Sequence, residues 1–445
     1  MLEGYANDES LRELASEVND FWCDGSIDTI DAPQSMQDVV VFLREYVSTR
    51  RPCIIRNAFP PNDENDSHRS ILTLDDILHN NDNNNNKNKN DCMIVVDVTP
   101  DGHGDCIRHV KDTTTTTTDC TKKMFVKPMQ VSMTISQFTE SLRNGRNKQQ
   151  QQQLLTNHFD PIESTIFPIM EQQQQQQKMT SKNEEEEIRR MEQEWNNDAV
   201  LYYSRQNDCL RNELQELIPS YMYPSSFSWA ELAFGTGPPD AINIWIGDER
   251  AVSSMHKDPY ENLFYVWSGE KIFTLCPPSD ILFLQENKYP SATFHCNNNN
   301  HQNNNNNNSQ NHDQHSSSFS WSVKPDYNSD NDDQEGNLDL PKKTNCLVQW
   351  IETDVERILS PTSNCQPETN VDTSSLSSSI ISNYINPIRV SVKQGEMLYL
   401  PSLWLHRVTQ TCETIGINYW YDMKFEGPNW TLFQFLQQIK LKQKV

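Results

Sequence analysis

The chain has 445 residues and a formal net charge of −25, from 62 acidic and 37 basic side chains. This balance argues against direct binding of nucleic acid, because the phosphate backbone attracts clustered lysine and arginine. The 11 cysteines are scattered without any C-x-x-C pair, which indicates reduced thiols rather than a disulfide framework or a zinc ribbon. The sequence has no apolar run of about 18 residues and no signal-peptide pattern at its start. We therefore expect a protein of the cytoplasm, with the nucleus as the alternative, and no contact with membranes.

The first part of the chain mixes helical and strand patterns. Apolar residues recur at helical spacing over residues 11–18 and again in MQDVVVFLREYV, residues 36–47. RPCIIRNAF, residues 51–59, is typical of a short strand that ends in a turn. We interpret residues 1–145 as an N-terminal region of helices and strands that packs on a barrel.

Polar tracts interrupt the ordered patterns, and patterning resumes directly after each tract. CMIVVDVTPDG, residues 92–102, follows an asparagine tract and predicts a strand closed by a Pro-Asp-Gly turn. A helix is expected from Ser136 onward. Polar tracts cannot bury enough apolar surface to order themselves, and lengthening a loop costs entropy that grows only slowly with length. We therefore read three segments as insertions in one fold: the Gln/Glu-rich 146–198, the Asn-rich 297–336 and the Ser/Thr-rich 360–382.

The second half of the chain is rich in short strands. β-branched and aromatic runs bounded by Gly or Pro turns occur in AINIWIG, ENLFYVWSG, EKIFTLCPP, IRVSVKQGEMLYLP, LWLHRVTQT and TIGINYWYDM. Such spacing predicts a mainly β fold with flanking helices, built as a barrel or a double-sheet jelly roll. We assign the barrel domain to residues 199–425, and WTLFQFLQQIKL predicts a C-terminal helix within residues 426–445.

A candidate metal site begins in SSMHKDPYENLFYVWSGEKIF, residues 253–273. Residues two apart in a strand face the same side, so His256 and Asp258 would point together and Lys257 away from them. With His406 from LPSLWLHRVTQ they would offer two imidazoles and one carboxylate, which suits non-haem Fe(II) and leaves positions open on the metal. A His-x-Asp pair alone is more often a surface hydrogen bond; the aromatic strand after it and the distant histidine favour the metal site.

Lys271 has two interpretations. The preceding Ser-Gly-Glu favours a hairpin turn, where a lysine would simply be solvated. The apolar run IFTLCPP directly after it instead places Lys271 at the start of a buried strand. A buried lysine requires an anionic partner, and a bound dicarboxylate would be one.

HKDPYENLFYVWSGEK and GEMLYLPSLWLHRV resemble the JmjC family of 2-oxoglutarate-dependent oxygenases, and in particular its small lysyl-hydroxylase branch. RPCIIRNAF, VDVTPDG and INYWYDM extend the resemblance over the ordered segments from about residue 5 to 437. The family implies a double-stranded β-helix of the cupin type, with Fe(II) and 2-oxoglutarate as cofactors. It matches the iron ligands to His256, Asp258 and His406.

The same resemblance implies the contacts of the cosubstrate. Lys271 would hold the C5 carboxylate of 2-oxoglutarate, and Ser253 would contact the same carboxylate, although the family usually has threonine there. Tyr203 is the alternative to Tyr202, because the register of that strand is uncertain beside an insertion. The predicted cosubstrate residues are thus Lys271, Ser253, Asn262, Asn418 and Tyr202.

The resemblance also implies what the enzyme acts on. In the branch that the sequence resembles, the substrate is a lysine side chain of developmentally regulated GTP-binding proteins, hydroxylated at C3, and members form homodimers through terminal helices. Glu261, Asp248 and Glu249 are candidates to attract a cationic substrate. Two alternatives remain: an endopeptidase or demethylase acting on methylated histone tails, and a cupin-like binding protein without catalysis. The sequence has no H-E-x-x-H helix of a zinc peptidase.

Overall fold

The computed structural model describes residues 13, 17, 26–59, 73–79, 92–111, 121–156, 199–298, 319–326, 346–356, 385 and 387–442. Contacts divide the chain into two compact units, one from residues 1–89, 203–288 and 349–445, the other from residues 90–202 and 289–348. Each unit joins segments that are far apart in sequence, whereas the boundaries predicted above run in chain order. The helix expected over residues 11–18 lies outside the described residues except at two positions.

One sheet of the first unit holds six strands, and most of them were predicted from the sequence. Its order is β1 (Asp28–Asp31), β2 (Cys53–Arg56), β17 (Met397–Leu400), β11 (Tyr260–Ser268), β19 (Thr414–Asp422) and β9 (Ala241–Gly247). The β1–β2 pair is parallel and the other pairs are antiparallel. β11 and β19 are interior strands; eight of the nine residues of β19 and five of the nine residues of β11 are buried.

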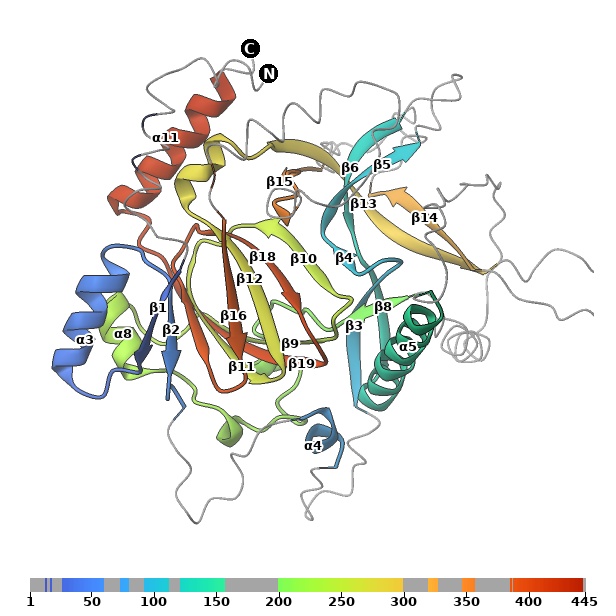
Figure 1. Cartoon of the computed structure of the whole chain (residues 1–445), viewed down its shortest axis with the longest axis horizontal. Coiled ribbons are helices and arrows are strands. Elements are labelled where there is room, and N and C mark those ends of the chain that lie inside the picture. The colour runs from blue at the N-terminus through green and yellow to red at the C-terminus, as the bar shows by residue number, and fades with distance from the viewer. Residues whose placement is uncertain are drawn as a thin grey trace, which may run out of the picture. The chain divides into compact units, whose positions relative to one another are not determined.

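The second sheet of this unit holds His256, Lys271 and His406. Its antiparallel order runs β16 (Ile388–Lys393), β12 (Glu270–Cys276), β18 (Leu405–Gln410) and β10 (Val252–His256). Buried side chains of both sheets form one core cluster, in which the rings of Phe264 on β11 and Phe273 on β12 are 5.2 Å apart. Two antiparallel layers around a shared core confirm the predicted mainly β jelly roll (Figure 1).

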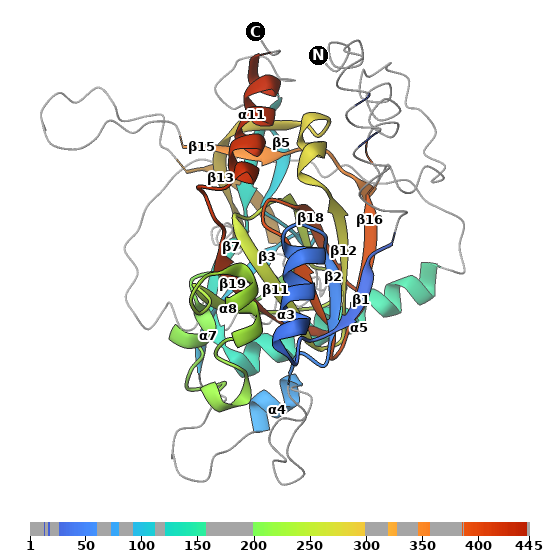
Figure 2. The same ribbon diagram turned by 90° about the vertical axis from the view of Figure 1, so that its left-hand side faces the viewer.

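Helices cover the edge of the six-stranded sheet. α3 (Met36–Phe42) begins at Ser35, which forms a capping box with Asp38, and it continues into the π-helical turn η1 (Leu43–Val47). Phe42 contacts the rings of Trp229 and Tyr399 at centroid distances of 5.4 and 5.3 Å. α8 (Ser228–Phe234), which holds Trp229, lies beside α3 (Figure 2).

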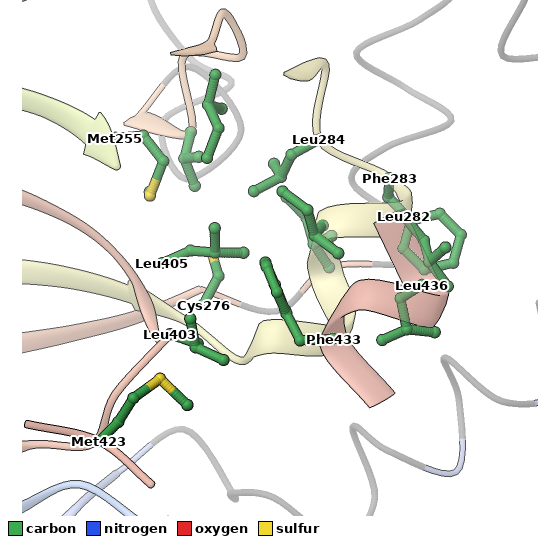
Figure 3. Close-up of a cluster of buried hydrophobic side chains, with 14 residues drawn as sticks. Met255, Cys276, Leu282, Phe283, Leu284, Leu403, Leu405, Met423, Phe433 and Leu436 are labelled. Carbon is green, nitrogen blue, oxygen red and sulfur yellow. The ribbon is translucent and has the colours of Figure 1, made fainter. Parts of the chain in front are cut away.

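The remaining helices of the first unit are short, apart from the last one. They are α4 (Leu74–His79), α7 (Cys209–Asn212) and the 3-10 turns η3 (Ser220–Met222) and η4 (Pro278–Leu282). α11 (Pro428–Lys442) is the predicted C-terminal helix, and it packs on η4. Phe433 and Leu436 of α11 point into a buried cluster with residues of η4 and of β18 (Figure 3).

The second unit contains two smaller sheets and one long helix. One sheet has the order β14 (Phe319–Pro325), β13 (Glu286–Asn298), β6 (Thr121–Lys127) and β5 (Cys106–Lys111), with β15 (Leu347–Ile351) also on β13. Residues 286–288 of β13 and 349–351 of β15 belong to the first unit. The other has the order β7 (Met129–Thr134), β3 (Met93–Thr99) and β8 (Val200–Tyr202); β4 (His103–Gly104) follows the turn after β3. α5 (Ile135–Thr156) packs on β3, β7 and β8 and continues through the first glutamine tract, so the helix expected from Ser136 is confirmed.

Two further expectations concern the described residues only. The eight cysteines among them are all free, in agreement with the prediction of reduced thiols. Within this part of the chain, none of the helices combines the length and the apolar character that crossing a membrane requires.

Two glycines with the same backbone geometry allow a matched test of this packing. Gly269, between β11 and β12, and Gly395, between β16 and β17, have φ values of +82° and +83°. A Cβ atom at position 269 would lie 2.6 Å from the carbonyl oxygen of Glu413, whereas one at position 395 would meet nothing within 4 Å. We expect Gly395→Ala to cost about 1–2 kcal/mol, the cost of a left-handed backbone. Gly269→Ala should cost about 1–3 kcal/mol more, the cost of overpacking.

Urea unfolding with equal slopes for both variants would measure this difference in the free energy of unfolding. Equal losses at the two positions would show that the turn at Gly269 can relax away from Glu413.

Candidate metal centre

Two neighbouring strands bring the two histidines together. His256 ends β10 and lies directly opposite His406 on β18, and their ring centroids are 4.1 Å apart. Ser253 pairs with Val408, so three residue steps on β10 match two steps on β18. This is a β-bulge, which turns a side chain that regular alternation would send to the other face. Without it, Ser253 and His256 could not both oppose residues on one face of β18.

Asp258 reaches the histidines from outside the strand. β10 ends at His256, so the strand alternation predicted for His256 and Asp258 is wrong, although the side chains do converge. The backbone N–H of Leu403 donates to the carbonyl oxygen of Asp258 at 2.8 Å and holds this loop against the start of β18. Oδ2 of Asp258 lies 3.8 Å from Nε2 of His256 and 3.6 Å from Nε2 of His406.

The histidine tautomers fit a metal ion. Nδ1 of His256 is 2.7 Å from the carbonyl oxygen of Ser254, and Nδ1 of His406 is 2.9 Å from that of Trp404. A carbonyl oxygen only accepts, so each Nδ1 carries the proton and each Nε2 keeps its lone pair for a ligand bond. Burial, followed by the nearby His256, lowers the pKa of His406 to about 4, so its ring is neutral at pH 7.

The donor set is the one that the sequence predicted. One ligand atom each from His256, Asp258 and His406 lies within 4.8 Å of the others, a group that could hold a metal ion. Two imidazoles and one carboxylate on one side of a metal leave the remaining positions open, as in non-haem Fe(II) sites.

A strained turn supports two of the three ligands. Leu403, which donates to Asp258, has a φ of +67°, a conformation that costs a branched residue of order 1–3 kcal/mol. Arg50 holds this turn, because its Nη2 donates to Oγ of Ser402 at 3.0 Å and its carbonyl accepts from the Trp404 indole at 2.9 Å. Glu261 accepts from Ser402 and is therefore part of this support.

Two of the three acidic residues suggested for a cationic substrate are thus engaged inside the protein. Glu261 accepts from the hydroxyls of Ser402 and Tyr399, both at 2.7 Å. Asp248 is fully buried and forms an ion pair with Arg250 at 2.6 Å. We therefore do not assign substrate contacts to either carboxylate.

Lys271 is buried on the same sheet as the histidines. It is the second residue of β12, so the interpretation as a buried strand residue is confirmed and the solvated turn is excluded. Nζ of Lys271 donates to Oε1 of Gln410 on β18. Burial disfavours the charged form and lowers the pKa of Lys271 from 10.5 to about 7. A bound carboxylate would favour the charged form again.

The two predicted asparagines lie on the opposite sheet and contact each other. Nδ2 of Asn418 is 3.5 Å from Oδ1 of Asn262, and Oδ1 of Asn418 accepts from the Trp245 indole at 2.9 Å. Both asparagines are buried. They lie on the face that carries Phe264 into the core between the sheets, because Phe264 pairs directly with Asn418. Their cosubstrate role, like that of Ser253, stays a prediction.

The two tyrosines differ in their surroundings. Tyr202 ends β8 of the second unit, where it pairs with Asp97 of β3. Tyr203 belongs to the first unit and is fully buried, with its backbone paired to Ile246 and its hydroxyl 3.4 Å from Glu213. Tyr203 therefore has a structural partner, and the choice of Tyr202 stays a prediction.

Sequence reasoning missed three residues near the ligands. The ring of His256 lies parallel to the Trp350 indole at 6.0 Å, and no local pattern announced Trp350. Gln410 could have been found, because it follows His406 by four positions and period 2 places both on one face. Glu286 is the third: its buried carboxylate forms an ion pair with Lys257, which points away from the ligands as expected.

Comparison with known proteins agrees with this geometry. The model of the cupin-like domain family matches residues 40–427. The chain belongs to the cupin-like domain family. The match spans both segments that supply the predicted ligands.

Three proteins that are similar in sequence to this chain have names that refer to the JmjC domain. JmjC domain-containing protein E of Dictyostelium discoideum is 29% identical over 98% of this chain and 95% of its own length. Lysine-specific demethylase JMJ32 of Arabidopsis thaliana is 33% identical over 55% of this chain and 58% of its own length. The human bifunctional peptidase and (3S)-lysyl hydroxylase JMJD7 is 32% identical over 56% of this chain and 61% of its own length. The predicted resemblance to the JmjC oxygenases is thus confirmed.

In the part of the chain that the structure describes, the geometry predicts one divalent-metal site. Co²⁺ is a spectroscopic probe of sites of this type. Titration of the protein with Co²⁺ should show one ion bound at this ligand group per chain. Alanine at His256, Asp258 or His406 should each weaken binding by more than about 100-fold, beyond the effect of losing an outer partner. His109→Ala, at an exposed position of β5, is the control. Tight binding in all three ligand variants would place the metal elsewhere.

Proposed function

We propose that this protein is an Fe(II)- and 2-oxoglutarate-dependent protein oxygenase that hydroxylates a lysine side chain at C3. One observation carries the proposal: the two candidate histidine ligands and the buried Lys271 share one face of one sheet. Lys271, Phe273 and Leu275 of β12 pair with Gln410, Val408 and His406 of β18. Directly paired residues in an antiparallel sheet project to the same side.

The spacing on this face suits a dicarboxylate. His406 and Gln410 are four residues apart, which corresponds to roughly 13 Å at about 3.3 Å per residue. A five-carbon cosubstrate with its keto-acid end at the metal would extend along this face toward the Lys271 ammonium. Gln410 would keep that ammonium oriented, and the apolar Phe273 and Val408 between the two ends would exclude water.

Each residue has a defined part in this proposal. The two histidines and Asp258 would bind the metal on one side, and Lys271 with Ser253 would bind the far carboxylate. When bound, iron and 2-oxoglutarate supply the chemistry that activates O₂, converts 2-oxoglutarate to succinate and CO₂, and adds oxygen to a C–H bond. The protein positions the substrate carbon and keeps the pocket dry.

A lysine substrate is supported by the edge of the site next to Asp258. The rings of Tyr260 and Trp420 are stacked with centroids 4.8 Å apart. Burial and the carboxylates of Asp240, Asp422 and Asp258 raise the pKa of Tyr260, so this edge combines aromatic rings with negative charge. An ammonium group is attracted by both features. The human relative named as a lysyl hydroxylase supports the same substrate class.

A second candidate function uses the same site. Similarity to a protein named as a lysine-specific demethylase favours removal of a methyl group from methyl-lysine, as on histone tails. The name of the human relative also includes a peptidase. The intact ligand group and the buried Lys271 argue against a binding protein without catalysis.

Mass spectrometry of a co-expressed target would separate these functions. With a developmentally regulated GTP-binding protein as the target, we expect one lysine-containing peptide to gain the mass of one oxygen atom. Co-expression with His256→Ala should leave the peptide unmodified, because a metal ligand is missing. Loss of a methyl group from a methyl-lysine peptide, or cleavage of the peptide, would overturn lysyl hydroxylation.

The burial of Lys271 predicts how cosubstrate affinity depends on pH. Below about pH 7 the lysine of the free protein is already charged, so affinity for 2-oxoglutarate should be independent of pH there. Above about pH 7 it must gain a proton on binding, so the Kd should rise with pH by up to about tenfold per unit. Calorimetry with Mn²⁺ in place of iron, under anaerobic conditions, would measure this.

Lys271→Met is the matched variant for this titration. It should weaken binding and remove the pH dependence above pH 7, while His109→Ala should keep both. Unchanged affinity in Lys271→Met would contradict the role of this lysine.

A further inference from the structure

Lys257 stands between two predicted metal ligands, yet its side chain leaves the site. Its Nζ forms an ion pair with Glu286, whose side chain is 2% exposed, while that of Lys257 is 19% exposed. The same Nζ lies 5.6 Å above the centre of the Phe433 ring. An exposed lysine forms such contacts only weakly, whereas a largely desolvated pair depends strongly on both partners. The Lys257 ammonium group is therefore held by both the Glu286 carboxylate and the Phe433 ring.

These contacts connect the metal loop to the C-terminal helix. Glu286 lies at the start of β13, and its second carboxylate oxygen accepts from Nε2 of Gln437 at 3.2 Å. Phe433 and Gln437 are four residues apart on α11 and so lie on the same face of the helix. Lys257 thus contacts one face of α11 directly through Phe433 and indirectly through Glu286.

The same face of α11 also packs behind the three ligands. Phe433 and Leu436 belong to one buried cluster with Met255, Leu403 and Leu405 (Figure 3). Met255 precedes His256, Leu403 donates its N–H to the Asp258 carbonyl, and Leu405 precedes His406. Each predicted ligand is thus adjacent, in sequence or through a hydrogen bond, to a side chain of this cluster.

We infer that Lys257 is a positioning residue for the metal centre, and that it acts by fixing the loop of Asp258 to α11 through Glu286 and Gln437. The apolar cluster supports the two histidines, which lie on strands. Asp258 lies on a loop beyond the end of β10, and the ion pair one residue before it restricts that loop. The inference rests on the proposed function only in taking His256, Asp258 and His406 as the ligands.

The test measures Co²⁺ affinity and the visible absorption spectrum of the bound Co²⁺, both in the absence of turnover. Lys257→Met keeps the aliphatic stem and removes the charge, so we expect about tenfold weaker Co²⁺ binding and a changed spectrum. Glu286→Gln should give a similar loss. Lys257→Arg should restore most of the affinity, because it keeps the ion pair. The double variant Lys257→Met with Glu286→Gln should lose less Co²⁺ affinity than the two single variants together. Each single variant leaves one buried charge without its partner, whereas the double variant removes both charges.

Lys288→Met is the control, because it makes the same substitution at an exposed position two residues from Glu286 on β13. Thermal unfolding of each variant shows whether it is folded, and Glu286→Gln and Lys257→Arg keep the test decisive if Lys257→Met does not fold. Wild-type affinity and spectrum in folded Lys257→Met and Glu286→Gln would overturn the inference. A wild-type protein that binds no Co²⁺ at the ligand group would instead overturn the proposed function.

Discussion

The pairing of β10 with β18 is the constraint on which the candidate site depends. It sets His256 opposite His406, and the bulge in β10 places His256 on the same face as Ser253. A single hydrogen bond, from Leu403 N–H to the Asp258 carbonyl, then ties the loop after β10 to the turn before β18. The pairing of the two backbones is therefore what brings the His256 and His406 side chains together. This explains why three residues spread over 150 positions of sequence can form one compact group.

Burial gives the same sheet its second property. Lys271 lies in an interior that disfavours its charge, and burial lowers its pKa to about 7. The charged state of this lysine would therefore be stabilised by an anion bound beside it. The strand that carries Lys271 pairs with the strand that carries His406, so the distance between Lys271 and the candidate metal ligand His406 is set by register. A shift of register by one residue would turn Lys271 to the other face and remove this relation.

The strands could be predicted from the sequence because they follow from short-range periodicity, whereas the candidate metal ligands were predicted from the kind of residues, the strand beside them and the resemblance to a known family. The sequences of β9, β11, β12 and β19 are apolar and aromatic runs with Gly or Pro at their boundaries, and such runs are typical of buried strands. The bulge could not be predicted, and the alternation expected from His256 to Asp258 was wrong because β10 ends at His256. Trp350 and Glu286 are near the ligands only through tertiary contacts, for which the sequence carries no local signal.

The positions of the polar tracts follow from the same constraint. All three predicted ligands, Lys271 and both asparagines lie in two segments, residues 252–276 and 397–422, which contain no tract. Most strand residues of these segments have a fixed register partner, so a residue inserted in a strand would shift the side chains beyond it to the opposite face. The Asn-rich and Ser/Thr-rich tracts lie between these segments, where a longer connection changes the closure entropy only slowly. A longer tract is tolerated where it leaves strand register unchanged. The tracts of this chain accordingly lie outside the two segments in which strand register positions the candidate site residues.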